Sequence, residues 1–154
     1  DHDTAEFAVA TIRKWWRKMG TPTYVKASHL LITADSGGSN AARNRLWKCE
    51  LQKMVNQTGL IISVCHFPPG TSKWNKIEHK MFSFISMNWK GKPLIDYEVI
   101  INLIQGTKTE KGLKIKAKLD KRKYKRGKKI ADKDFNNIGL KSHSINPNWN
   151  YSIQ

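Results

Sequence analysis

The sequence predicts an α/β fold built on parallel β-strands. Two short apolar runs, residues 30–34 and 60–67, contain few polar positions, and such runs are typical of strands buried on both faces of a sheet. Residues with helical spacing lie before, between and after these runs, which gives the order helix-strand-helix-strand-helix. Two strands joined by a helix form a right-handed parallel βαβ unit, so we expect both strands to run in the same direction.

End signals delimit the first two helices. Asp3 and Glu6 have the spacing of a capping box, and Gly20 is the expected end of the first helix. Asn40 is the expected N-cap of the second helix, and Gly59 is its expected C-cap. Each helix carries an apolar stripe, formed by Ala8, Ile12, Trp15, Trp16 and Met19 in the first and by Trp47, Leu51, Met54 and Val55 in the second.

A third helix is predicted directly after residues 68–70, Pro-Pro-Gly, which end the second strand. Thr71 or Ser72 can cap this helix, and Glu78 lies at the edge of its apolar side. That side comprises Trp74, Ile77, Met81, Phe84 and Ile85. A shorter helix is expected to begin at Asp96 and to end at Gly106.

The C-terminal part of the chain is strongly basic. Residues 113–119 alternate apolar residues with lysine, which is typical of a strand with one buried face. Between residues 108 and 133 there are 13 Lys or Arg residues and 3 acidic residues, which leaves a net charge of +10. We therefore expect residues 93–154 to form a basic α+β extension, packed on a core that residues 1–92 contribute.

Composition favours a globular protein that binds a polyanion. Of its 154 residues 39% are hydrophobic, which is enough for one domain with a core. The 28 Lys and Arg residues outnumber 12 acidic residues and give a net charge of +16, for which nucleic acid is the expected partner. We find no membrane-length apolar run and no secretory signal, so we expect a cytoplasmic protein without a membrane partner. Cys49 and Cys65 lack the spacing of a zinc site or a disulfide framework.

Asp35 and Glu78 are the candidate catalytic residues. Asp35 ends the first predicted strand, and the working groups of open parallel sheets gather at the carboxyl ends of the strands. Carboxylates are ligands that Mg²⁺ prefers, and two such ions can activate a hydroxyl and stabilise the leaving oxygen of a phosphodiester. Both residues also have ordinary explanations, because Asp before Ser-Gly-Gly is a good turn residue and Glu on a helix is commonly solvated.

Three other residues have both a functional and an ordinary interpretation. His66 and His79 can contact a metal-bound water or a phosphate, or they can be ordinary hydrogen-bonded histidines. Trp74 can stack on a base, or its spacing with Ile77 and Met81 can place it in the core. For each of the three residues the sequence pattern favours the ordinary interpretation.

Basic residues near the third helix and in the C-terminal part are the candidate DNA contacts. A basic run is commonly a solvated loop, but the high net charge of this chain favours contact with backbone phosphates. The candidates are Lys73, Lys76, Lys121, Arg122, Lys123, Lys125, Arg126, Lys128 and Lys129.

Three segments of the chain resemble the ISAzo-thirteen family of insertion-sequence transposases. They are residues 31–40, LITADSGGSN, residues 65–79, CHFPPGTSKWNKIEH, and residues 148–151, NWNY. The resemblance extends over essentially the whole chain. It implies a ribonuclease H-like fold and a DDE triad of acids that cuts and joins DNA strands with Mg²⁺ or Mn²⁺. Asp35 matches the second acid of the triad, and Glu78 matches the third.

The same resemblance implies that the first acid lies outside this chain. In the ribonuclease H-like order that acid is on a strand ahead of the first helix, whereas Asp1 and Asp3 are expected to cap the helix. Residues 1–92 would then be the C-terminal two thirds of the core, without its first three strands. We expect the 154 residues alone to bind metal weakly, to leave a sheet edge exposed and to be catalytically inactive.

The leading hypothesis is a catalytic-domain portion of a DDE transposase, which cleaves and transfers the ends of an insertion sequence into target DNA. A homo-oligomer in a synaptic complex and association with the bacterial nucleoid are further expectations from the resemblance. One alternative is a non-catalytic DNA-binding module or decayed transposase remnant. A second alternative is a nuclease with a ribonuclease H-like fold, which would cut DNA without joining it.

Overall fold

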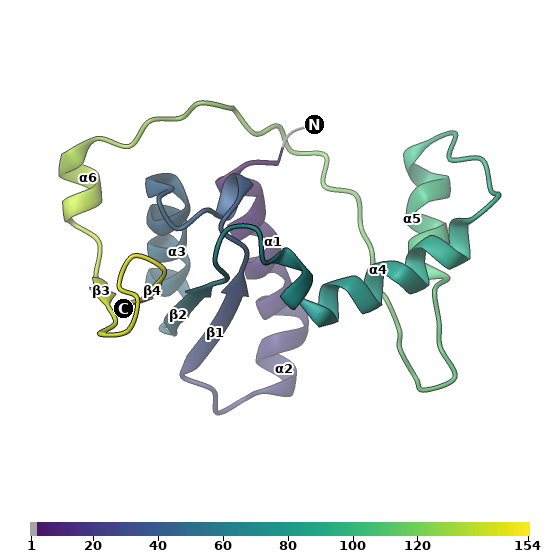
Figure 1. The fold of residues 1–154 in the computed structure, drawn as a ribbon, viewed down its shortest axis with the longest axis horizontal. Coiled ribbons are helices and arrows are strands. Elements are labelled where there is room, and N and C mark those ends of the chain that lie inside the picture. Colours follow the sequence, from purple (N-terminus) through teal and green to yellow (C-terminus); the bar gives the residue numbers. More distant parts are fainter. Residues whose placement is uncertain (1–2) are drawn as a thin grey trace. The chain divides into compact units, whose positions relative to one another are not determined.

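The computed structural model describes residues 3–154, apart from the side chain of Ser72. The chain forms two compact units (Figure 1). The first unit comprises the residues up to Ser72 together with Lys123–Gln154, and the second comprises Lys73–Arg122. Within the described part of the chain, we find no helix whose length and apolar character would suit a membrane span.

A mixed four-stranded sheet forms the centre of the first unit, in the order β1-β2-β4-β3. The strands β1 (His29–Ala34) and β2 (Ile61–His66) are parallel, as predicted. The strand β4 (Asn150–Ile153) is antiparallel to β2, and β3 (Leu140–Ser142) is antiparallel to β4. The molecule is therefore an α/β protein in which the C-terminal hairpin completes the sheet.

Helices cover one face of this sheet. The helix α1 (Ala5–Trp15) packs on α3 (Arg45–Thr58), and α3 also contacts β2, β4 and α6 (Asp132–Asn136). The core lies between α1, α3 and the sheet, where each fully buried apolar side chain stabilises the fold by roughly 1.5–3 kcal/mol. Its largest fully buried side chains are Val9, Trp47, Leu51, Met54, Ile62, Val64, Tyr151 and Ile153.

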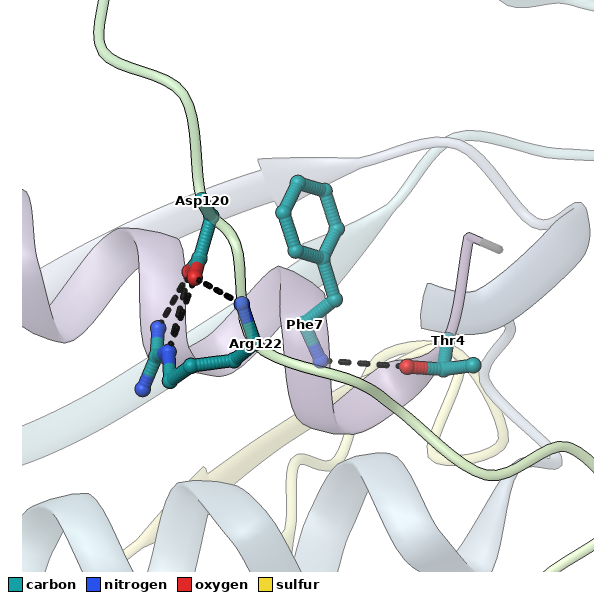
Figure 2. Close-up of polar contacts among 4 residues, drawn as sticks. All are labelled: Thr4, Phe7, Asp120 and Arg122. Atoms are coloured by element: carbon teal, nitrogen blue, oxygen red, sulfur yellow. Dashed lines mark hydrogen bonds and ion pairs between the residues drawn. The ribbon is translucent and has the colours of Figure 1, made fainter. Parts of the chain in front are cut away.

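The first helix begins one residue later than the predicted capping box. Thr4 is the N-cap, since its backbone is extended and its hydroxyl accepts a hydrogen bond from the Phe7 N–H at 3.2 Å (Figure 2). The capping-box prediction for Asp3 and Glu6 is therefore wrong. The Asp3 carboxylate accepts a hydrogen bond from the Ser39 hydroxyl at 2.8 Å, and the cap expected at Asp1 lies outside the described residues.

Gly20 does not end the first helix, because the chain continues through a π-helical turn (Trp16–Gly20) into the short α2 (Thr21–Thr23). A Cβ at Gly20 would collide with the Trp16 ring, so this glycine permits a close approach of side chain to backbone. The N-cap of α3 is Asn44 rather than the predicted Asn40. The predicted C-cap is confirmed at Gly59, whose positive φ of 69° suits glycine.

The expectation that β1 is buried on both faces is wrong. Its side chains alternate between exposed and more buried positions, and Leu31 is 63% exposed. The physical reason is that α1 and α3 pack on one face of the sheet, so the side chains on the other face of β1 stay exposed. In the described sheet β1 pairs only with β2. The strand β1 is accordingly an edge of the sheet, as expected.

Two helices form the second unit. The helix α4 (Lys76–Trp89) follows a 3₁₀ turn (Ser72–Trp74) and packs against α5 (Tyr97–Gln105). Its N-cap position is Asn75 rather than Thr71 or Ser72. The predicted cap of α5 is confirmed, because the Asp96 carboxylate accepts a hydrogen bond from the third residue into the helix at 2.8 Å.

The predicted apolar side of α4 holds only toward its C-terminal end. Ile85 is buried, whereas Trp74 is 54% exposed and Ile77 is 84% exposed. The core interpretation of Trp74 is thus wrong, because this residue lies in the turn before the helix, where no layer of the second unit covers it.

The predicted strand at residues 113–119 is also wrong. This segment pairs only through a single bridge between Lys114 and Lys108, and a strand needs a longer ladder of hydrogen bonds. Half-buried apolar residues and exposed lysines still alternate from residue 113 to residue 118, and Leu119 is exposed. The domain boundary at residue 92 stays a prediction. The compact units instead separate near residues 72 and 122.

Candidate functional site

Asp35 directly follows the last residue of β1, as predicted. In the parallel pair, Ala34 at the end of β1 lies opposite His66 at the end of β2, so both strands end at the same edge of the sheet. The Asp35 side chain is exposed, and the short helical turn Gly38–Asn40 follows it. Gly38 has a positive φ of 63°, which L residues with side chains rarely adopt.

Three consecutive residues around Asp35 are hydrogen-bonded to the end of β2. The Phe67 N–H donates to the Ala34 carbonyl at 2.7 Å, and a His66 ring nitrogen, Nδ1, lies 3.1 Å from the Asp35 carbonyl. The Ser36 hydroxyl donates to the Phe67 carbonyl. The backbone on both sides of the Asp35 carboxylate is therefore fixed to the sheet.

Asn40 contacts the carboxylate itself. With its amide oriented toward neighbouring acceptors, its nitrogen donates to the Gly37 carbonyl at 2.8 Å and to Asp35 Oδ1 at 3.2 Å. The sequence suggested a helix cap for Asn40, and this contact was missed. A polar residue five positions after Asp35 in a glycine-containing turn was the available signal.

His66 is a buried, hydrogen-bonded residue, which confirms the ordinary interpretation of this histidine. Its side chain is 6% exposed, and its Nε2 atom lies 3.1 Å from the hydroxyl of Tyr151. The Trp47 indole N–H donates to the same hydroxyl at 2.9 Å. Burial lowers the pKa of His66 and raises the pKa of Tyr151. Neither Tyr151 nor Trp47 was a predicted site residue, although Tyr151 ends one of the segments that carry the family resemblance.

Glu78 lies in the first turn of α4, where its negative charge interacts favourably with the positive end of the helix dipole. Its side chain is exposed, and its Oε2 atom accepts a hydrogen bond from the Asn75 amide at 2.6 Å. His79 follows it and is also exposed. Glu78 belongs to the second compact unit and Asp35 to the first.

The two carboxylates suit a hard divalent cation individually. Both are exposed and offer oxygen atoms, which are the ligands that Mg²⁺ and Mn²⁺ accept. Among the described residues we find no group of three or more His, Cys, Asp or Glu side chains positioned to hold an ion.

All nine candidate DNA-binding residues are exposed. Lys73, Lys76, Lys121 and Arg122 belong to the second unit, and the other five belong to the first. Arg122 is engaged with Asp120, whose carboxylate accepts hydrogen bonds from the Arg122 guanidinium, at 2.9 and 3.1 Å from Nε, and from its backbone N–H at 3.1 Å (Figure 2).

Lys128 is likewise engaged in an ion pair, because its ammonium group donates to Glu6 at 2.7 Å. This hydrogen bond raises the pKa of Lys128. The first unit also contains a cavity of about 550 Å³ whose lining includes Lys128 and Lys129. Arg43 and Arg45 line the same cavity, and these two cations were missing from the predicted set because they lie outside the basic run.

Comparison with known proteins identifies the family. The family described as Rhodopirellula transposase DDE domain matches residues 1–154, the whole chain. Searches of curated proteins and of solved structures returned no match. The α/β fold with a mixed sheet is compatible with such a domain. Because the match spans the full length, the chain belongs to the family of transposase DDE domains.

Proposed function

We propose that this chain is the catalytic-domain portion of a DNA transposase that cleaves and joins phosphodiester bonds at the ends of an insertion sequence. The observation that carries the proposal is the family match over all 154 residues. The position of Asp35 at the carboxyl end of a parallel strand supports it, because catalytic groups gather at this edge in open α/β sheets. On this proposal the sheet is part of a ribonuclease H-like core.

Asp35 and Glu78 supply two carboxylate ligands of a catalytic Mg²⁺ or Mn²⁺ centre in this proposal. A bound divalent cation would assist the attacking hydroxyl and the departing oxygen of the phosphodiester. The Asp35 backbone is fixed by the end of β2, and Asn40 orients one oxygen of the Asp35 carboxylate. Glu78 contributes a carboxylate from a helix N-terminus, held by Asn75.

The nine exposed basic residues bind the DNA backbone in the proposed function. A net charge of +16 favours any DNA sequence equally, so these contacts supply affinity and leave the recognition of the element ends to other features. Arg43 and Arg45 extend the set, because they line a cavity together with Lys128 and Lys129. On the same proposal the protein acts at the bacterial nucleoid in the cytoplasm, as a homo-oligomer in a synaptic complex with element ends and target DNA.

Substitution of the two carboxylates tests the proposal. In the transposase polypeptide that contains this chain, Asp35→Asn and Glu78→Gln are each expected to abolish strand transfer of the element ends with Mg²⁺ or Mn²⁺. DNA affinity should not fall, because both changes remove a negative charge. Strand transfer is measured on labelled end-containing DNA, and DNA affinity is measured by fluorescence anisotropy on the same duplex.

Matched controls remove one negative charge elsewhere in the same unit. Asp134→Asn, in α6, controls for Asp35→Asn, and Glu98→Gln, in the first turn of α5, controls for Glu78→Gln. Both controls should keep strand transfer near the parent level. Retained strand transfer in Asp35→Asn or Glu78→Gln would contradict the assignment of that residue. DNA that is cut and never joined would instead favour the nuclease, and binding without cleavage in the parent would favour the non-catalytic module.

A further inference from the structure

A series of buried hydrogen bonds, here called the relay, connects the Asp35 backbone to His66, Tyr151 and Trp47 in the interior of the first unit. The Asp35 carbonyl lies 3.1 Å from His66 Nδ1, and His66 Nε2 lies 3.1 Å from the Tyr151 hydroxyl. The Trp47 indole nitrogen lies 2.9 Å from the same hydroxyl. The Tyr151 and Trp47 side chains are each 1% exposed, so this relay is shielded from water.

The donor and acceptor capacities of these groups allow one arrangement with a neutral imidazole. A backbone carbonyl only accepts, so the proton on the His66 ring must be on Nδ1. An indole only donates, so the Tyr151 oxygen accepts from Trp47 and gives its own proton to His66 Nε2. Every group in the relay is then satisfied, and loss of one member would leave the others unpaired in a buried environment.

The relay acts on the Asp35 peptide, which lies just past the end of the strand ladder and before Ser36, whose hydroxyl donates to the Phe67 carbonyl. The ladder ends at the Phe67 N–H, which donates to the carbonyl of Ala34, the residue before Asp35. Beyond Ser36 the chain passes into two glycines, which have wide conformational freedom. Only the His66 contact acts on the Asp35 peptide itself, among the hydrogen bonds recorded in the described residues.

We propose that His66 and Tyr151 are positioning residues for Asp35, which hold its backbone so that the carboxylate projects from the sheet edge in an orientation suited to a divalent cation. This inference rests on the proposed metal-binding function of Asp35. It makes the C-terminal strand β4 a determinant of the site, although Tyr151 follows Asp35 by more than a hundred residues. His66 and Tyr151 are buried, so on this proposal they act through the Asp35 backbone rather than by direct contact with a metal or substrate.

The test combines a ring-NMR measurement with Mn²⁺ titration of the chain. The ¹⁵N shifts of the His66 ring should show the neutral Nδ1–H form in the absence of metal. Mn²⁺ should broaden the backbone amide signals at Asp35, and the concentration that gives half of the broadening measures the affinity. Tyr151→Phe keeps the ring and removes only the hydroxyl, and it should weaken Mn²⁺ binding at Asp35 at least fivefold.

Two histidine variants separate positioning from simple loss of packing. His66→Asn places an amide donor near the position of Nδ1 and should keep Mn²⁺ affinity within about twofold of the parent. His66→Gln places its amide near the position of Nε2 and should lose affinity as Tyr151→Phe does. This pair carries the test if Tyr151→Phe does not fold. Duplex DNA affinity should be equal in all folded variants, because none of the changes touches a surface cation.

Ser63→Ala is the matched control. Ser63 and Ser152 are bonded through their hydroxyls at 2.8 Å on the same two strands that carry His66 and Tyr151, yet neither contacts Asp35. This variant should bind Mn²⁺ like the parent. A Nε2–H tautomer, or parent-like Mn²⁺ affinity in folded Tyr151→Phe and His66→Gln, would overturn the positioning role. No Mn²⁺ effect at Asp35 in the parent would overturn both this role and the proposed metal function, and that outcome is recognised before any variant is made.

Discussion

Asp35 and Glu78 are held in opposite ways. The Asp35 backbone is bonded to the end of β2, and that contact continues through a buried relay to α3 and β4. Glu78 is exposed on the first turn of α4, where its hydrogen bond comes from Asn75, three residues earlier. The comparison shows that the setting of Asp35 depends on the tertiary structure of the first unit, whereas the setting of Glu78 depends on one helix turn.

The largest expected difference is between the stability effects of one residue in the core of the first unit and one residue beside Glu78. Leu51 is fully buried under the sheet, so Leu51→Ala should lower the free energy of unfolding by about 3 kcal/mol. Ile77, one residue before Glu78, is 84% exposed, so Ile77→Ala should change the free energy of unfolding by less than about 0.5 kcal/mol. Urea denaturation of both variants measures these values. A cost above about 2 kcal/mol for Ile77→Ala would mean that another surface covers this residue in solution.

A second prediction concerns how the free energy of unfolding depends on pH. Burial lowers the pKa of His66 in the folded chain. Below the ordinary histidine pKa of about 6.5, the unfolded chain therefore binds a proton more readily than the folded chain does. The stability present above this pH should fall as pH decreases through it, by at most about 1.4 kcal/mol per pH unit for this one group. His66→Asn should show a shallower acid slope in urea denaturation between pH 7 and pH 5. An unchanged slope would contradict the prediction.

A third prediction compares matched helix caps, one in each unit. The Asn44 side chain accepts a hydrogen bond from the Trp47 N–H at 3.3 Å and also donates to the Ser39 carbonyl at 2.7 Å. Asp96 accepts one from the Val99 N–H at 2.8 Å. Replacement by alanine should cost about 1 kcal/mol in either case.

The segments that the loss of each cap destabilises should differ between the two units. Native-state hydrogen exchange should show that Asn44→Ala speeds exchange throughout the buried part of the first unit, because α3 is at the centre of its core. Asp96→Ala should speed exchange in α5 and α4 only. Faster exchange in β2 of Asp96→Ala would show that the two units unfold together.

The sequence pattern predicted the parts of Asp35's setting that depend on local order. Two apolar runs joined by a helix were enough to predict parallel strands, and parallel strands place Asp35 at their carboxyl edge. The end of α3 at Gly59 was predicted because a left-handed C-cap is a local property. The missed capping of α1 was also local, since Asp3 and Thr4 are neighbouring residues of similar capping ability.

The rest of the setting depends on residues that are distant in the sequence. The hydroxyl of Tyr151 reaches His66 only because β4 pairs with β2, and no periodicity near either residue indicates that pairing. The lysine alternation at residues 113–119 led to the opposite error, because alternation records burial and does not supply a partner strand. Sequence reasoning therefore located the Asp35 carboxylate and missed what holds it.

The smallest predicted effect is on the salt dependence of DNA binding, and it differs between two cations of the basic run, one from each unit. Lys125 belongs to the first unit, and Lys125→Ala should reduce the slope of log affinity for duplex DNA against log salt by about 0.9, the value for one phosphate. Arg122 belongs to the second unit and is bonded to Asp120, so a phosphate must compete with that carboxylate. Arg122→Ala should therefore reduce the slope by less than half as much.

Asp120→Asn sharpens this comparison, because it removes the competing negative charge while it keeps the size of the side chain. In that background Arg122→Ala should reduce the salt slope by nearly as much as Lys125→Ala does, since the guanidinium is released toward the DNA backbone. Fluorescence anisotropy on one duplex between 50 and 200 mM salt, a range in which phosphate contacts weaken strongly, measures the slopes of the parent, the three single variants and the double variant. If Arg122→Ala has the same effect with and without Asp120, the ion pair does not limit the contact of Arg122 with DNA.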